Sequence, residues 1–277
     1  RTWESLISHN AGIDFGFFNN RLRASFDWFQ KTNDGMFIDV TYPAVLGASA
    51  PKTNNGKLRT RGWEIEVNWR DRIGQVNYNV GFNVFDAKTK LLELTNNENV
   101  PTAGINSKRL IGKPINAIYV FQTDGVFQTQ EEVDAYYEMY YWNADHSGPK
   151  QGNILPAPIE NSVDRLRPGA RKRVDVNGNG VIDEHDLYYA GDTAPRVSFG
   201  IKGGLEWKGI DLSVFFQGVG KQTILRSGNM YAPFVVNYCL QNNTFIGKTW
   251  TEENHSNEYT ILSRSNNFNR FNYANSD

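Results

Sequence analysis

One segment, residues 175–186, has residue types and a spacing that suit metal binding. Its sequence, DVNGNGVIDEHD, places oxygen-bearing side chains at loop positions 1, 3, 5, 9 and 12, with glycine at position 6. This is the pattern of an EF-hand-type calcium loop, in which position 7 contributes its backbone carbonyl. The candidate ligands are Asp175, Asn177, Asn179, Val181 through its carbonyl, Asp183 and Asp186.

The spacing of this loop has a physical basis. Gly180 permits the sharp turn that brings the first three side chains together, and Ile182 is expected to anchor the loop inward. Asp186 stands where glutamate is usual, so it binds through one oxygen or draws the loop tighter. Two of the first three side chains are neutral asparagines, which favours a structural calcium over a regulatory switch. The alternative is a polar turn without metal.

Outside this loop the sequence shows no group of residues that indicates catalysis. It has no nucleophile elbow, no HExxH and no phosphate-binding glycine motif, and the acidic pair Glu64 and Glu66 is explained as one face of a strand. The lone Cys239 excludes an internal disulfide or a thiolate zinc cluster. Lys plus Arg (29) balances Asp plus Glu (30), so no net charge attracts nucleic acid. We therefore expect neither an enzyme nor a nucleic-acid-binding protein.

The elements that position the loop are expected to be β-strands. Apolar and polar residues alternate strictly over 63–70 and again over 76–84, after a short polar connection at 71–75, which predicts a hairpin. Similar alternation predicts a hairpin over 11–30, with a turn at 18–21, and another over 197–217, with a turn at Lys208-Gly209.

The connections between these strands differ greatly in length. Tight turns near residues 19, 73 and 208 alternate with long polar segments at about 34–57, 88–194 and 219–277. A short helix, capped by Thr129, is predicted within the longest of these segments. Alternating short and long connections are typical of a transmembrane β-barrel with short periplasmic turns and long extracellular loops. The alternative is a soluble β-sandwich, which explains the strand pattern but not the loop lengths.

A barrel would cross the membrane with strands. No stretch approaches the ~18 consecutive apolar residues of a membrane helix, and the mean hydropathy of −0.54 is uninformative for alternating strands. About six strands cannot close a membrane barrel, so we expect the chain to be an incomplete part of one. The predicted lipid-facing residues are Trp63, Ile65, Val67, Trp69, Val76, Tyr78, Val80 and Phe82.

Several sequence blocks resemble the C-terminal half of SusC/RagA-type TonB-dependent outer-membrane transporters, a Bacteroidetes family. In chain order these blocks are NAGIDFGFFNNRLRASFDWFQKTND (10–34), NGKLRTRGWEIEVNW (55–69), IGKPINAIYVFQTDGVFQTQEEVDAY (111–136), RPGARKRVDVNGNGVIDEHD (167–186), APRVSFGIKGGLEWKGIDLSVFFQGVGK (194–221) and KTWTEENHSNEY (248–259). The family often has Asp where Asn179 stands, and the segment before the loop is usually less basic than residues 170–173 are here. These two differences affect the expected calcium affinity and not the expected fold.

The resemblance implies an all-β fold, with residues 1–277 as part of a barrel of about 22 strands around a plugged lumen, and 175–186 as a calcium loop within an extracellular connection. It further implies outer-membrane localisation, contact with outer-membrane lipid, and import of glycans or peptides with a SusD-like surface lipoprotein. Energy would come from the TonB complex, which engages an N-terminal part that this chain does not contain.

Two other functions remain open from the residues alone. One is a secreted, calcium-stabilised β-rich module for carbohydrate binding or adhesion, and the other is a calcium-dependent hydrolase with a carboxylate pair across a cleft. Aromatic side chains in the long connections suit either stacking on sugar rings or structural packing, and packing is the preferred interpretation. These residues are Tyr140, Tyr141, Trp142, Tyr231 and Trp250.

Overall fold

The structure is a computed structural model that describes residues 2–38, 53–94, 104–105, 110–226 and 243–273. Cys239 and Tyr231 lie outside the described residues. The chain forms two compact units. The first comprises Arg1–Asn99, Arg109–Ala117 and Asp192–Thr223, and the second comprises Val100–Lys108, Ile118–Gly191 and Ile224–Asp277.

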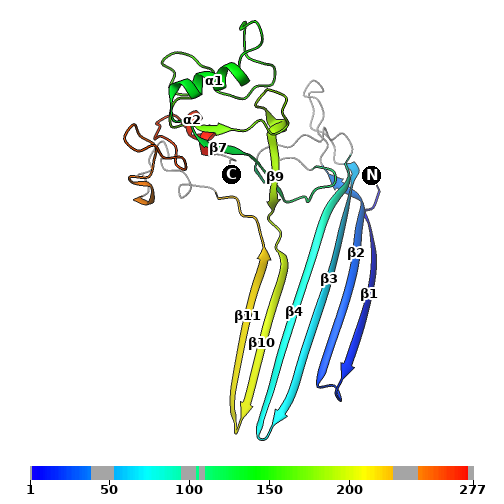
Figure 1. Cartoon of the computed structure of the whole chain (residues 1–277). Coiled ribbons are helices and arrows are strands. Elements are labelled where there is room, and N and C mark those ends of the chain that lie inside the picture. The colour runs from blue at the N-terminus through cyan, green and yellow to red at the C-terminus, as the bar shows by residue number, and fades with distance from the viewer. Residues whose placement is uncertain (1, 39–52, 95–103, 106–109, 227–242, 274–277) are drawn as a thin grey trace. The chain divides into compact units, whose positions relative to one another are not determined.

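The first unit is a six-stranded antiparallel sheet (Figure 1). Its strands are β1 (Ser5–Phe17), β2 (Leu22–Ile38), β3 (Thr53–Ile73), β4 (Val76–Leu94), β10 (Arg196–Trp207) and β11 (Ile210–Lys221). Their order in the sheet is β1-β2-β3-β4-β10-β11, and each neighbouring pair is antiparallel. The three predicted hairpins are therefore confirmed as β1–β2, β3–β4 and β10–β11.

The strands are longer than the sequence pattern predicted. Residues 71–73 continue β3, so the predicted connection 71–75 shrinks to Gly74-Gln75, with Gly74 at a positive φ of 60°. At the other end, residues 34–38, 53–57 and 88–94 extend strands where polar loops were predicted. Backbone pairing continues through these polar residues because the ladder needs only N–H and C=O groups, not apolar side chains.

The sheet has one apolar and one polar face. Because directly paired residues share a face, the register aligns Phe15, Ala24, Val67, Phe82, Ile201 and Phe216 in one row across all six strands. The adjacent row on the opposite face consists of Asp14, Ser25, Glu66, Asn83, Gly200 and Gln217. The predicted lipid-facing residues of β3 and β4 all belong to the apolar face.

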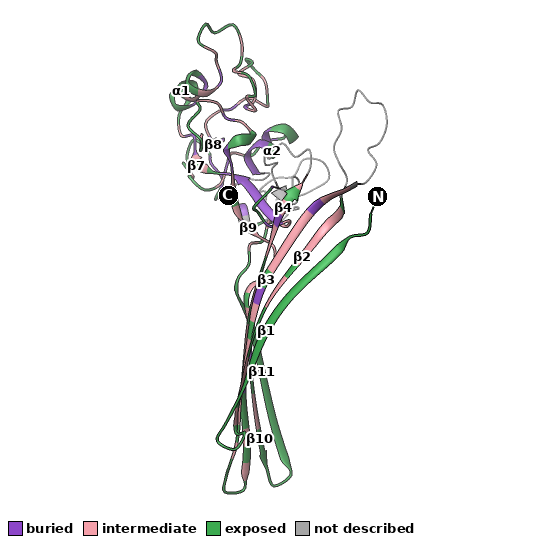
Figure 2. Ribbon diagram, turned by 90° about the vertical axis from the view of Figure 1, so that its right-hand side faces the viewer, coloured by how far each residue is buried: buried purple, intermediate pink, exposed green. Residues whose placement is uncertain are grey.

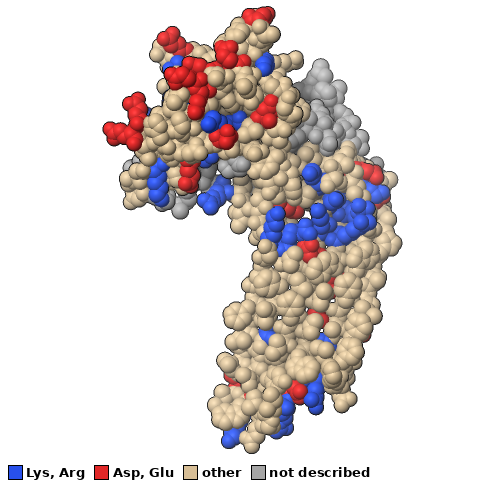
Figure 3. Space-filling model, in the orientation of Figure 1, with Lys and Arg blue, Asp and Glu red and all other residues tan. Residues whose placement is uncertain are grey.

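The apolar face of this sheet is exposed. Side chains on it such as Val80 (51%) and Leu212 (58%) are about half accessible, and most residues of the sheet are exposed or intermediate (Figure 2). A space-filling view shows this face as largely uncharged, with Lys and Arg gathered in a band across one part of it (Figure 3). Among the described residues of the first unit, the buried apolar side chains are Leu91, Leu110, Pro114 and Ala117. The sheet therefore lacks the dry core of a sandwich.

The second unit contains the segments that were predicted as long polar connections, and it is folded. Its elements are β5 (Gly104–Ile105), β6 (Ala117–Phe121), β7 (Thr123–Val126), α1 (Gln130–Tyr140), β8 (Arg171–Arg173), η2 (Glu184–Asp186), β9 (Leu187–Asp192), η3 (Asn243–Phe245) and α2 (Asn266–Tyr273). Strands β5, β6 and β9 form one sheet, and β7 pairs with β8 in another. No helix among the described residues is long and apolar enough to cross a membrane.

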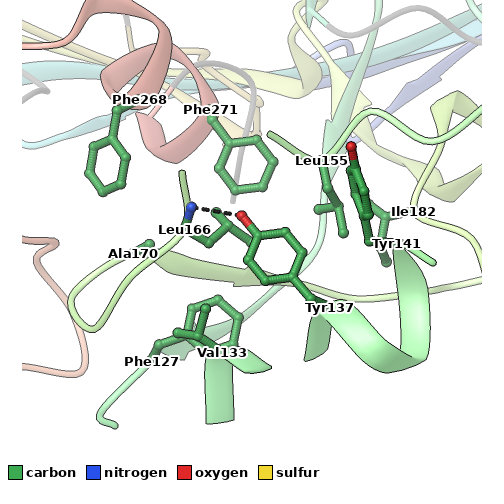
Figure 4. Packing of buried hydrophobic residues seen from close by; sticks show 10 residues of the cluster. All are labelled: Phe127, Val133, Tyr137, Tyr141, Leu155, Leu166, Ala170, Ile182, Phe268 and Phe271. Atoms are coloured by element: carbon green, nitrogen blue, oxygen red, sulfur yellow. Dashed lines mark hydrogen bonds between the residues drawn. The ribbon is translucent and has the colours of Figure 1, made fainter. Parts of the chain in front are cut away.

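A buried cluster holds the second unit together (Figure 4). Val133 and Tyr137 of α1 pack there with Phe268 of α2 and with Ile182. The Tyr137 hydroxyl accepts a hydrogen bond from the Leu166 backbone N–H at 2.9 Å, and burial raises its pKa to about 12. The predicted helix is confirmed: it begins after the Thr129 cap, and it extends beyond 136 because Tyr137 faces this cluster.

Candidate functional site

The candidate calcium loop lies between β8 and β9 and ends in the short helix η2. Asp175, at position 1, accepts backbone hydrogen bonds from Gly178 (2.7 Å), Asn179 (3.2 Å) and Gly180 (2.7 Å). The chain curls tightly around this carboxylate because Gly178 and Gly180 adopt positive φ angles of 72° and 77°. The predicted turn at position 6 is therefore confirmed.

The next two candidate ligands continue the same curl. The Asn177 side-chain oxygen accepts from the Asn179 N–H at 2.9 Å, and the Asn179 oxygen accepts from the Val181 N–H at 2.8 Å. A carbonyl oxygen has two lone pairs, so each amide oxygen retains one after making its backbone bond. The repeated side-chain-to-backbone bonds hold three oxygens along the inside of one turn.

Asp186, at position 12, closes the loop from within. Its side chain is fully buried and accepts from the Val176 N–H (2.9 Å), the Asn177 N–H (3.4 Å) and the Asp183 N–H (2.9 Å). Burial raises the pKa of this carboxyl group, and the three backbone donors act in the opposite direction. Asp183 in turn accepts from the His185 N–H at 2.7 Å, so the two carboxylates form a reciprocal cap at η2.

The loop is attached to the rest of the second unit by contacts on both sides of position 7. Ile182 is fully buried, which confirms its predicted role as an anchor, and its carbonyl accepts from the Ile154 N–H at 3.0 Å. The Lys150 ammonium donates to the carbonyls of Gly180 (2.7 Å) and Met139 (2.6 Å), which connects the loop to α1. The sequence carried no signal for Lys150.

The chemistry of these donors suits a hard cation. All of the candidate ligands offer oxygen, which Ca²⁺ prefers. Within the described ranges, no three His, Cys, Asp or Glu side chains gather closely enough to hold a metal by themselves, so amide and backbone oxygens would complete the set. In those ranges no Lys or Arg forms an ion pair with Asp175 or Asp186. A carboxylate as buried as Asp186 without a basic partner is costly, and a bound cation would offset that cost.

Arg173, two residues before the loop, is buried between two aromatic rings. Its guanidinium carbon lies 4.0 Å from the Phe121 centroid and 4.1 Å from the Phe271 centroid, and its Nη2 donates to the Phe271 carbonyl at 2.7 Å. Burial lowers the pKa of Arg173 to about 10, and the cation–π contacts compensate in part for the lost hydration. The sequence showed only that residues 170–173, which precede the loop, are basic. The partners come from β6 and α2, so no local pattern reveals them.

The aromatic residues considered for sugar stacking mostly serve packing. Tyr141 (8% exposed) and Trp250 (5%) are buried, while Tyr140 and Trp142 pack against the buried cluster. The Trp250 indole N–H donates to the Gln128 side chain at 3.1 Å. The preferred interpretation as structural residues is therefore supported for these four.

The sheet of the first unit forms a wall with two distinct surfaces. Its tight turns, at 18–21, 74–75 and 208–209, all lie at one end, and the long connections leave from the other. On the apolar face the Trp69 indole N–H donates to the Tyr78 hydroxyl at 3.1 Å. The polar face carries Lys202 beside Glu66 at 3.6 Å. A wall that is apolar on one side and polar on the other is the construction of a transmembrane barrel with a hydrated interior.

Comparison with known families agrees with this class of protein. A family model described as the β-barrel of TonB-dependent receptor-like proteins matches residues 2–156. The chain therefore belongs to the TonB-dependent receptor β-barrel family, and the predicted outer-membrane localisation is confirmed.

Individual relatives show which class within this family the chain resembles. The chain is 25% identical to a TonB-dependent receptor of Formosa agariphila over 83% of this chain and 22% of the relative. It is 27% identical to the TonB-dependent receptor SusC of Bacteroides thetaiotaomicron over 76% of this chain and 19% of SusC. The resemblance to the SusC/RagA-type class is thus confirmed. The chain spans about a fifth of the length of these curated relatives.

Solved structures share the fold. The RagAB peptide importer in its closed-closed state aligns with a TM-score of 0.68 at 19% identity, covering 99% of this chain and 28% of that chain. The structure of the RagAB peptide transporter aligns with a TM-score of 0.63 at 20% identity, covering 99% of this chain and 27% of that one. The predicted antiparallel barrel fold is confirmed by these matches together with the open, two-faced sheet.

Proposed function

We propose that this chain is part of a transporter that imports nutrients across the outer membrane, driven through TonB by the inner-membrane proton gradient. The observation that carries the proposal is a family match that coincides with a continuous apolar face across six paired strands. The strands would form part of the barrel wall, with the polar face toward the lumen. Catalysis has no place in this role.

The proposed cargo is a glycan or a peptide, delivered by a SusD-like surface lipoprotein that covers the barrel. Support comes from the similarity to SusC and from the shared fold with the RagAB peptide transporter. TonB would act through an N-terminal part of the full protein. The described aromatic side chains considered for stacking are buried or pack against the buried cluster, so we propose no cargo-contacting residue.

Cells that lack the full-length protein are expected to take up one of two cargo classes, labelled oligopeptides or labelled oligosaccharides, about tenfold or more slowly than wild-type cells. The reason is that both classes diffuse slowly through the outer membrane. Restoring the gene should restore uptake, and an uncoupler that collapses the proton gradient should abolish it. Normal uptake of both classes without the protein, or uptake that persists in the uncoupler, would contradict the proposal. A protein found freely soluble outside the cell would favour the secreted binding module.

We also propose that residues 175–186 bind a structural Ca²⁺. Asp175, Asn177, Asn179, Val181 through its carbonyl, Asp183 and Asp186 would hold the ion, either directly or, at Asp183, through water. Support comes from the tight curl, the buried anchor at Ile182 and the buried carboxylate of Asp186. When bound, the ion would neutralise these carboxylates and fix the connection between β8 and β9.

Removing Ca²⁺ is expected to loosen the loop without unfolding the sheet. Because two of the ligands are neutral asparagines, we expect a dissociation constant for Ca²⁺ of about 10⁻⁴ to 10⁻³ M. At 10 mM, Ca²⁺ is at least about ten times more concentrated than this, so its binding should stabilise the loop and slow hydrogen exchange across 174–187 by about tenfold or more. The measurement is hydrogen–deuterium exchange of the full-length protein with Ca²⁺, with Mg²⁺ and with a chelator. The β10–β11 turn serves as an internal control and should not respond. Equal exchange in all three conditions would show that the loop holds no calcium.

A further inference from the structure

Four basic side chains gather on the apolar face of the sheet, in the part from which the long connections leave. They are Arg59 and Arg61 of β3 and Lys88 and Lys90 of β4, and together we call them the basic belt. The register pairs Arg61 with Lys88 and Arg59 with Lys90. The band of Lys and Arg on the largely uncharged face is visible in Figure 3.

Alternation along the strands places the basic belt on the side that faces lipid. Arg59 and Arg61 are separated by even steps from Trp63, Ile65 and Val67, so all of these side chains share one face. Lys88 and Lys90 share that face because they pair directly with Arg61 and Arg59. The belt therefore points toward the membrane and not into the lumen.

The basic belt lies just beyond the apolar band. From Ile73 to Trp63 the strand rises about 33 Å at ~3.3 Å per residue, which a strand tilt of about 40° reduces to about 25 Å, the usual height of the lipid-facing band. Trp63 pairs with Trp28, so two indoles mark the upper boundary. Such aromatic residues lie at the level of the headgroups. The next outward-facing residue of β3 is Arg61, which places the belt among the headgroups of the outer leaflet.

No carboxylate in the part of the chain that the structure describes pairs with the basic belt. Within the described ranges none of its four members forms an ion pair; Arg61 donates only to the neutral Gln30 side chain, at 2.6 Å. The nearest carboxylates in the ladders are already engaged. Asp86, below the belt, is held by Arg196, and above the belt Lys57 pairs with both Asp34 (3.0 Å) and Glu93 (3.8 Å). The belt thus presents four uncompensated positive charges at the membrane boundary.

The spacing of the belt suits a phosphate group. Adjacent strands are about 4.8 Å apart and alternate residues about 6.7 Å apart, so the four cations repel one another within a patch that a phosphate could bridge. Arg61 and Lys88 are exposed, and the long stems of Arg59 and Lys90 can lie along the apolar surface while their charges reach the headgroups. We propose that the basic belt binds the phosphate groups of glycolipid in the outer leaflet of the outer membrane.

The test uses the full-length protein, purified in mild detergent and titrated with lipid A, an acylated and phosphorylated diglucosamine, in mixed micelles. Bound lipid is counted by native mass spectrometry. Replacing all four belt residues with glutamine should reduce the bound-to-free ratio by about tenfold or more, because each basic residue near an anionic membrane surface strengthens binding. Enzymatically dephosphorylated lipid A should bind the wild-type protein as weakly as lipid A binds the variant.

A matched variant controls for the loss of charge. Arg23, Lys31, Arg70 and Arg72 lie on the polar face, and their replacement by glutamine removes the same charge and should leave lipid binding unchanged. If the fourfold belt variant fails to assemble, the exposed pair Arg61→Gln and Lys88→Gln replaces it. Undiminished lipid A binding by the assembled belt variant, an equal loss in the polar-face control, or equal binding of the dephosphorylated lipid would overturn the proposal. So would displacement of lipid A by millimolar inorganic phosphate, which would indicate a site for free anions.

Discussion

Val67→Arg is expected to prevent most of the full-length protein from assembling into the outer membrane. Val67 lies midway along the apolar stretch of β3 between Ile73 and Trp63, and it pairs with Ala24 and Phe82 on the same face. An arginine on the lipid face at the bilayer midplane costs about 2–4 kcal/mol. Snorkelling offers little relief there, because both headgroup regions are distant. The folded, heat-modifiable band on an unboiled gel should therefore fall severalfold.

The adjacent residue provides a matched control. Asn68 follows Val67 in the same strand but belongs to the polar face, where it pairs with Arg23 and Gly81 and donates to Glu66 at 2.8 Å. Asn68→Arg adds the same side chain at the same depth, yet it should assemble normally because its charge faces water and Glu66. Normal assembly of Val67→Arg, or equal loss in both variants, would show that this face is not in contact with lipid.

Alternation predicted the faces of the sheet correctly but placed the strand ends too early. The prediction ended strands where charged residues interrupt the apolar series, as at Asp71 and Lys88. In the structure Asp71 remains in β3 and pairs with the Arg21 guanidinium at 3.0 Å, and Lys88 continues β4 opposite Arg61. The apolar series ends near the upper boundary of the lipid band, and the backbone ladder continues beyond it toward the long connections. The apolar–polar alternation therefore predicted the lipid-facing part of each strand but not the full length of the strand.

The candidate loop was predictable because its geometry is local. Gly180 and Ile182 act within a few residues of one another, and both behave as the spacing predicted. The contacts of Lys150 and Arg173 were not predictable, because their partners come from distant segments. Lys150 reaches Gly180 across 30 residues, and Arg173 reaches Phe271 across 98. The same limit explains why residues 88–194 were expected to be a long polar connection: the buried cluster that folds them combines α1, α2 and the loop.

Asp186→Ala is expected to destabilise the loop in two separable ways. The fully buried carboxylate accepts hydrogen bonds from the N–H groups of Val176, Asn177 and Asp183, and alanine leaves these donors without an acceptor. For hydrogen bonds that are partly shielded from water, losing the acceptor costs about 1 kcal/mol each, so the loss of three should accelerate exchange across 174–187 about a hundredfold even in a chelator. If Ca²⁺ binds, the variant also loses the position-12 ligand, and added Ca²⁺ should no longer slow exchange.

Two further variants separate the capping role of Asp186 from metal binding. Glu184→Ala removes an exposed carboxylate from the same turn of η2 and should retain both the chelator baseline and the calcium response. Asp186→Asn retains an oxygen that can accept one or two of the N–H groups but removes the charge, so it should lie closer to wild type in chelator while responding weakly to Ca²⁺. A full calcium response in Asp186→Ala would remove Asp186 from the ligand set and leave it as a cap of η2. A wild-type exchange rate in chelator for that variant would contradict the three backbone hydrogen bonds to Asp186 themselves.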